Sequence, residues 1–267
     1  MAKHVRSRRP SPLYWLALFF FALVFLVSGG LLLHRLWQDS RVQADFETLE
    51  QQILPAPADT AAGADNTDRF AAITAMNPDF IGWISIEDTG VSFPVMYSPD
   101  RPDFYLRHNF SGEYSDSGTP YLDAACTLTD RQRSNNLIIY GHNMKTGTIF
   151  GPLTEYKKPE TYRDHPIVRL DTLYGDGAYE VFAAFAIDVV EDPDFAYNTY
   201  VDMDEAAFAS FVSQVKARSD VDSGITPVYR DELLTLSTCE YSSPNGRYVV
   251  CARRLADGAE GTGDLDS

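Results

Sequence analysis

A cysteine and an arginine lie at the two ends of a turn near the carboxyl end of the chain. The segment Leu233–Leu255 reads LLTLSTCEYSSPNGRYVVCARRL, and in it two β-like runs flank the turn residues Ser-Pro-Asn-Gly. Antiparallel pairing of these runs would place Cys239 opposite Arg247. A guanidinium near a thiol stabilises the thiolate, which attacks carbonyl groups, and it can hold the oxyanion of a tetrahedral intermediate. A buried strand-end cysteine beside a surface arginine explains these residues equally well.

A histidine at the end of another predicted strand could supply acid/base catalysis. In the segment NNLIIYGHNMKTGTIF, residues 137–140 form the strand, Gly141 lets the chain bend, and His142 follows. The ordinary pKa of histidine lies near neutral pH, so a histidine on a rigid strand end suits a general acid or base. The alternative is a lone histidine with only a structural role, and His108 is the rival candidate for the base.

Eight short β-like runs must position these groups. Turn residues separate the runs and long helices are few, which favours a closed or nearly closed β-barrel in a mainly β fold. The predicted strands are Ile81–Ile86, Val91–Met96, Thr119–Leu122, Asn136–Tyr140, Ile167–Leu170, Tyr179–Val190, Leu233–Cys239 and Arg247–Leu255.

Helical spacing appears at three places outside these strands. One inserted helix is predicted between Asp204 and Ser219, with Asp202 or Asp204 as its N-cap. A short helix is predicted over Asp68–Met76, because the proline that follows disfavours its continuation. A third, narrower apolar stripe forms either a stalk or a helix that docks on the domain, and it consists of Val42, Phe46, Leu49 and Ile53.

An uncharged segment of 21 residues, Leu13–Leu33, is long enough to span a hydrocarbon core of about 30 Å. Four basic residues precede it, so the positive-inside rule places the N-terminus in the cytoplasm and the remainder outside. A cleaved signal peptide is the alternative, but its apolar region is usually only about 7–15 residues long. The predicted divisions are a cytoplasmic tail (1–12), a transmembrane anchor (13–33), an extracellular stalk and linker (34–67), a folded domain (68–255) and an acidic disordered tail (256–267).

Charge and cysteine content exclude some classes of partner. The chain has 22 basic and 38 acidic residues, and removing the four basic residues before the anchor leaves a balance of −20. Such a surface repels phosphate backbones, so nucleic-acid binding is disfavoured. Three cysteines leave at least one thiol unpaired, even if Cys126 and Cys251 form a disulfide. We expect no metal and no cofactor, because no metal-ligand spacing or phosphate-binding Gly-rich loop is present.

The motifs TLSTC, with an arginine eight residues after the cysteine, and NLIIYGHNMK together resemble the sortase family. Supporting segments run from Asn77 to Leu255 and include NPDFIGWISI, a following FPV and YLRHNF. The helix inserted after Tyr179–Val190 is similar to class B rather than class A sortases. The resemblance implies a closed eight-stranded β-barrel with an N-terminal helical segment and one inserted helix.

The resemblance also implies a reaction and a set of partners. Cys239 would attack a Thr–Gly-like bond in the C-terminal sorting signal of a secreted protein, and it would form a thioester. His142 would protonate the leaving amine and deprotonate the incoming one, while Arg247 would hold the oxyanion. The acceptor would be an amine of cell-wall precursor or of a pilin-like subunit, and no cofactor would be needed. The residues that would line the substrate groove are Leu106, Tyr197, Ser237 and Glu240.

Two other functions stay open from the sequence. A cysteine peptidase with the same residues would pass the acyl group to water, and a non-catalytic, membrane-tethered binding module would use its cysteines only for packing. Asp123 and Asp188 are candidates for orienting His142, although acidic loop residues are more often simply solvated. The predicted location is the cell membrane, with a single span and the catalytic domain outside.

Overall fold

The computed structural model describes residues 12–53, 66–144, 146–239, 243 and 245–256. The chain divides into two compact units, Met1–Asp45 and Phe46–Ser267, and the helix α1 (Pro12–Ile53) contributes residues to both. Most of the predicted cytoplasmic tail and linker, and nearly all of the predicted acidic tail, lie outside the described residues.

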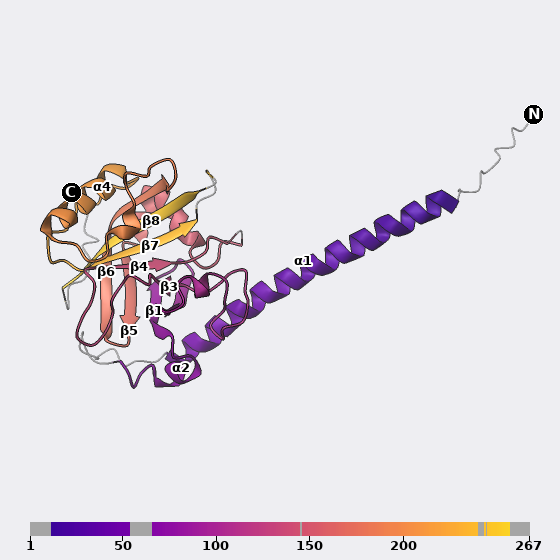
Figure 1. Ribbon diagram of the computed structural model, residues 1–267, viewed down its shortest axis with the longest axis horizontal. Helices are drawn as coiled ribbons and strands as arrows, with labels where there is room; N and C mark the ends of the chain where they lie inside the picture. Colours follow the sequence, from indigo (N-terminus) through magenta and orange to yellow (C-terminus); the bar gives the residue numbers. More distant parts are fainter. Residues whose placement is uncertain (1–11, 54–65, 145, 240–242, 244, 257–267) are drawn as a thin grey trace, which may run out of the picture. The chain divides into compact units, whose positions relative to one another are not determined.

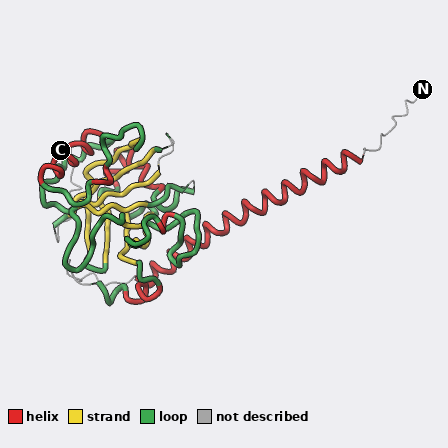
Figure 2. Tube along the Cα trace, viewed as in Figure 1, coloured by secondary structure: helices red, strands yellow, loops and turns green. Residues whose placement is uncertain are grey.

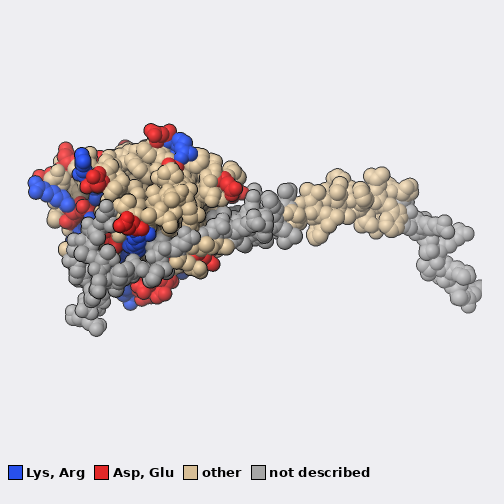
Figure 3. All heavy atoms as spheres, turned by 90° about the horizontal axis from the view of Figure 1, so that it is seen from below, with Lys and Arg blue, Asp and Glu red and all other residues tan. Residues whose placement is uncertain are grey.

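The described part of the first unit belongs to α1. Its segment Pro12–Gly30 is long and apolar enough to cross a membrane, by length and composition alone. The side chains of Leu13, Trp15 and Phe19 are exposed, and the space-filling view shows no charged side chain along this stretch (Figure 3). The segment coincides with most of the predicted anchor.

Eight strands in the second unit close into a barrel, in the order β1-β2-β3-β4-β7-β8-β6-β5 (Figures 1 and 2). The β2–β3 and β4–β7 pairs are parallel and the other pairs are antiparallel. The strands are β1 (Phe80–Ile86), β2 (Val91–Met96), β3 (Tyr121–Leu122), β4 (Asn136–Tyr140), β5 (Ile167–Thr172), β6 (Gly175–Asp188), β7 (Leu233–Cys239) and β8 (Gly246–Arg254).

The centre of the barrel is built from strands that are apolar on both faces. In β4 the side chains of Leu137, Ile138 and Ile139 are all fully buried. A strand that is covered on both faces has a continuous apolar sequence instead of an alternating one. The apolar sequence of β4 therefore favours its buried position beside its parallel neighbour β7.

Short helices and 3-10 turns cover the barrel. Asp204 is the N-cap of α4, since its carboxylate accepts a hydrogen bond from the amide of Ala207 at 2.8 Å. The buried residues of α4 pack in one cluster with Phe182 and Phe185 of β6, which explains their helical spacing. The elements are α2 (Ala71–Met76), η1 (Phe104–Leu106), η2 (Gly151–Lys157), α3 (Pro159–Asp164), η3 (Tyr197–Thr199) and α4 (Glu205–Arg218).

The predicted fold class is confirmed, and the strand boundaries differ at a few places. β6 begins at Gly175 instead of Tyr179, because its glycine-rich start gives no strand signal but still pairs with β5. The helical turns η2 and α3 were missing from the prediction. Pro159 at the first turn of α3 was the available signal, since proline is favoured at that position.

The carboxyl-terminal end of α1 packs within the second unit. Phe46 and Leu49 are only 3% and 4% exposed, and the Phe46 ring meets the Phe93 ring edge-on at 5.4 Å. The Ser92 hydroxyl donates to the Glu50 carboxylate at 2.6 Å. The apolar stripe that contains Phe46 and Leu49 was predicted to form either a stalk or a docked helix, and these two side chains are docked on the domain.

Candidate active site

Three neighbouring strands carry the predicted catalytic residues at one edge of the barrel. β7 and β8 pair so that Cys239 lies directly opposite Arg247. β4 runs parallel to β7 on its other side, with Tyr140 opposite Ser237. Figure 1 shows β4, β7 and β8 side by side. Continuing the β4–β7 register by two residues brings His142 beside Cys239.

Hydrogen bonds extend this register past the end of β4. The Gly141 amide donates to the Ser237 carbonyl at 3.1 Å. The Asn143 side-chain amide donates to the Cys239 carbonyl at 3.0 Å. The residue between these two contacts is His142, so its backbone is fixed against the strand end that bears the thiol.

Burial separates Cys239 from the other two cysteines. All three thiols are free, so the disulfide considered for Cys126 and Cys251 is not formed. Burial raises the pKa of the Cys126 thiol to about 12, and that of Cys251 also to about 12. Cys239 is half-buried at the edge of the barrel. Because the thiolate is the nucleophile, Cys239 is the cysteine suited to covalent chemistry.

The His142 ring is oriented by a backbone carbonyl. Its Nε2 lies 2.7 Å from the carbonyl oxygen of Leu106. A carbonyl can only accept, so Nε2 carries the proton, and in the neutral imidazole Nδ1 is then the acceptor. His142 therefore offers Nδ1 for proton exchange.

The pKa of His142 is lowered from its ordinary value, mainly because burial disfavours the imidazolium. The hydrogen bond to Leu106 and the charge of Asp116 act in the opposite direction, and the charges of Arg107 and Arg247 lower the pKa further. His142 is consequently neutral at pH 7, the form that can accept a proton from a thiol.

Arg247 brings a positive charge to the same edge. Its guanidinium donates to the Gly246 carbonyl at 3.0 Å. Its charge lowers the pKa of His142, and it partly offsets the burial that raises the pKa of Tyr121 and of Tyr197. These effects show that the cation lies near His142 as well as opposite Cys239, where developing negative charge would be stabilised.

The predicted groove residues have different environments. Ser237 and Tyr197 are buried, and their hydroxyls hydrogen-bond to each other at 2.7 Å. Leu106 is half-buried and contributes its carbonyl to His142. Glu240 lies outside the described residues. The roles of these four residues in substrate binding stay predictions.

The other predicted partners of the site have different contacts. Asp123 accepts hydrogen bonds from the Ala125 amide and the Tyr140 hydroxyl, and Asp188 accepts from the two amides that follow β6, so both carboxylates are engaged by groups other than His142. His108 is stacked on the Phe104 ring at 3.8 Å, and its Nδ1 contacts the Phe104 carbonyl. The orienting group for His142 is a main-chain oxygen, which no side-chain pattern could reveal.

Gly141 has a packing role instead of the predicted bend. Its φ is not positive, but a Cβ there would lie 2.6 Å from the ring of Phe150. The Phe150 amide in turn donates to the His142 carbonyl at 2.9 Å. Close packing of this ring, rather than backbone freedom, explains the glycine before His142.

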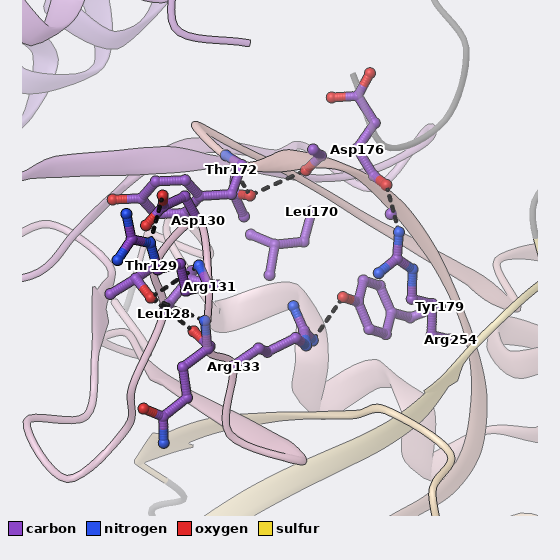
Figure 4. A pocket seen from close by; sticks show the side chains of 14 residues that line it. Leu128, Thr129, Asp130, Arg131, Arg133, Leu170, Thr172, Asp176, Tyr179 and Arg254 are labelled. Carbon is purple, nitrogen blue, oxygen red and sulfur yellow. Dashed lines mark hydrogen bonds and ion pairs between the residues drawn. The ribbon is translucent and has the colours of Figure 1, made fainter. Parts of the chain in front are cut away.

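A pocket of about 200 Å³ lies at the other end of the barrel, about 20 Å away along β7. Figure 4 shows Arg133, Tyr179 and Arg254 around it. Glu232 lies within ion-pair distance of both arginines, and Tyr179 accepts a hydrogen bond from Arg133. The described residues contain no group of His, Cys, Asp or Glu suited to a metal ion.

Comparisons with known proteins agree with this geometry. The sortase domain family matches residues 84–255, which is more than half of the chain. The chain belongs to the sortase family. It is 28% identical over 229 residues to sortase B of Listeria monocytogenes, covering 85% of this chain and 90% of that protein. It is 27% identical over 233 residues to sortase B of Staphylococcus aureus, covering 86% and 92%.

A solved structure supports the same class. The Staphylococcus aureus sortase B–substrate complex superimposes with a TM-score of 0.73 at 26% identity. The match covers 84% of this chain and 100% of the Staphylococcus aureus chain. The class B resemblance is thereby confirmed. As a sortase of class B, the chain is a cysteine transpeptidase, which excludes the non-catalytic module considered from the sequence.

Proposed function

We propose that this sortase is anchored in the cell membrane by Pro12–Gly30 and uses Cys239, His142 and Arg247 to transfer a sorted protein to an amine. The single observation that carries the proposal is the register that brings three strand ends together. One of them bears a half-buried thiol, one an imidazole with lowered pKa, and one a guanidinium.

The first half of the reaction is acylation of the enzyme. Neutral His142 takes the proton of the Cys239 thiol at Nδ1, and the thiolate attacks the carbonyl carbon of a peptide bond in a C-terminal sorting signal. The guanidinium of Arg247 stabilises the oxyanion. When the C–N bond breaks, His142 gives the proton to the leaving amine, and the acyl group stays on sulfur as a thioester.

The second half transfers the acyl group. An amine of cell-wall precursor or of a pilin-like subunit attacks the thioester carbonyl, and His142 takes a proton from that amine. The C–S bond breaks, and the proton returns to the sulfur, so the enzyme ends as it began. No metal or cofactor enters this sequence.

The experiment uses the full chain in detergent with a library of peptides that carry candidate sorting signals. Incubation with triglycine should give a product whose mass equals the acyl fragment joined to the amine. Cys239→Ala should remove both cleavage and transfer. Cys126→Ala and Cys251→Ala are matched controls in which a buried thiol is lost, and they should retain activity if they remain folded.

The same assay tests the alternative of a cysteine peptidase. If water is the natural acceptor, the hydrolysed fragment will dominate whether or not triglycine is present. Equal loss of cleavage in folded Cys126→Ala would mean that Cys239 is the wrong nucleophile.

A further inference from the structure

The carbonyl that orients His142 lies in a loop whose conformation depends on one glycine. This loop connects β2 to β3 and includes η1, where Leu106 is the last residue. Gly118 has a φ of +59°, a conformation that residues with a side chain rarely adopt. A Cβ on Gly118 would lie 2.5 Å from the Tyr105 carbonyl oxygen and 2.7 Å from the Leu106 carbonyl oxygen.

Those distances are too short for any real side chain. Both atoms are backbone, so the overlap cannot be relieved by turning a side chain. One of the displaced atoms would be the Leu106 carbonyl oxygen, which His142 Nε2 contacts at 2.7 Å. Only a glycine leaves that oxygen in its observed place.

The surrounding hydrogen bonds prevent the two backbone segments from moving apart. The Thr119 amide donates to the Tyr105 carbonyl at 3.0 Å, and the Ser115 amide donates to the Arg107 carbonyl at 2.9 Å. The Tyr105 side chain is 1% exposed, and its hydroxyl contacts Asp79 at 2.8 Å. A Cβ on Gly118 therefore has to break part of this arrangement.

We infer that Gly118 is a positioning residue for His142: its missing side chain leaves the Leu106 carbonyl where it holds the imidazole with the proton on Nε2 and Nδ1 free to accept. The inference rests on the proposed function, because it assumes that His142 is the acid/base. It adds a residue that lies 24 positions before His142 in the sequence and acts through the Leu106 carbonyl.

Loss of the carbonyl contact changes both the orientation and the pKa of the ring. The contact raises the pKa of His142, so its loss lowers the pKa further below the ordinary value. The charged groups that act on the ring are Arg107 and Asp116, of the same loop, and Arg247 of β8. The two arginines have no acceptor, and the Asp116 carboxylate already accepts from Arg107 and Tyr114, so the two neutral tautomers then compete.

The test compares Gly118→Ala with Gly112→Ala in the full chain in detergent. Gly112 lies in the same loop with a φ of +78°, but a Cβ there meets nothing within 4 Å. The two variants share the backbone strain, and only Gly118→Ala pushes on the Leu106 carbonyl. We expect kcat to fall by about a hundred-fold in Gly118→Ala, as a misplacement of about 1 Å can cause. In Gly112→Ala it should stay within about two-fold of the unsubstituted chain, since no contact changes.

A second readout distinguishes positioning from general damage. With 15N-labelled histidine, the unsubstituted chain should show His142 as one tautomer protonated at Nε2, and Gly118→Ala should show mixed tautomers and a lower pKa. The acid limb of the kcat/KM profile should move to lower pH with it. Equal kcat losses in the two glycine variants, or unchanged His142 shifts in Gly118→Ala, would overturn the inference.

The nitrogen shifts also keep this test independent of the proposed function. If the unsubstituted chain processes no sorting peptide, the proposed function fails, while the tautomer of His142 still decides the role of Gly118. If Gly118→Ala does not fold, the unsubstituted chain alone decides: mixed tautomers at His142 would show that the Leu106 carbonyl does not hold the ring.

Discussion

The end of α1 should contribute a large share of the stability of the barrel domain. The perturbation is a pair of shortened chains, one beginning at Ala44 and the other at Ile53. They differ by the segment that contains Phe46 and Leu49, which are buried against the barrel. The segment is too short to hold a helix without tertiary contacts. The stability difference therefore reports these contacts.

The magnitude follows from the burial of two side chains. Each large apolar side chain that is removed from water stabilises the fold by about 1.5–3 kcal/mol, so the pair contributes about 3–6 kcal/mol. The total stability of a domain is about 5–15 kcal/mol. The shorter chain should consequently lose about a fifth or more of its stability, and its Tm should fall by about 10 °C.

Urea denaturation followed by circular dichroism measures the difference. Phe46→Ala in the longer chain should account for about 3–5 kcal/mol by itself, because a large core side chain is truncated. Glu47→Ala is the matched control, since Glu47 is exposed on the same helix and should change stability by less than about 0.5 kcal/mol. Equal urea midpoints for the two shortened chains would refute the argument, and would place the start of the stable domain after α1.

Four further results are expected from the site and its surroundings. Alkylation of the folded chain at pH 8 should modify Cys239 alone, because a thiol with a pKa of about 12 is ionised only at about one part in ten thousand; mass mapping that finds a second modified thiol contradicts this. Arg247→Lys should lower kcat about a hundred-fold or more with the barrel still folded, since a flexible ammonium does not reproduce the planar guanidinium; near-normal turnover would remove the oxyanion role. Because the pKa of His142 is lowered on folding, the unfolded state binds more protons at this residue, and protonation of His142 should lower the free energy of unfolding as pH falls below the unfolded pKa of about 6.5. An acid titration in which His142→Asn loses as much stability over this pH range as the unsubstituted chain would contradict the assignment. Thr238→Val should raise the free energy of unfolding by about 1 kcal/mol, because the buried Thr238 hydroxyl has no partner among the described residues; a loss of stability would show that the hydroxyl is satisfied.

The fold could be predicted from the sequence because most strands carry their own signal. Strands such as β4 and β7 are short apolar runs bounded by turn residues, and this local pattern predicts a strand whichever strand it pairs with. Strand β3, with only Tyr121 and Leu122, and the glycine-rich start of β6 have little signal of their own. Their extent is decided by the neighbouring strands, which a local pattern does not contain.

The site could be predicted only as far as its side chains show it. Cys239 and Arg247 flank one turn, so their pairing follows from a local hairpin. The approach of His142 depends on the parallel pairing of β4 with β7, about a hundred residues apart, and this required a family resemblance. The orienting group is the Leu106 carbonyl. Every residue carries a backbone carbonyl, so only the position of this one in space distinguishes it from the others.

The histidine is held from two sides by backbone that breaks local rules. On one side Gly118 has positive φ, and the space it leaves is filled by the Leu106 carbonyl that contacts Nε2. On the other side Ile149 is buried with a φ of +59°, which costs a β-branched residue about 1–2 kcal/mol. The residue after it, Phe150, donates its amide to the His142 carbonyl. Strain of this size persists only where surrounding contacts enforce it. Both positions adjoin contacts to His142, one to its ring and one to its backbone carbonyl, so the strain at Ile149 is spent where the position of His142 is set.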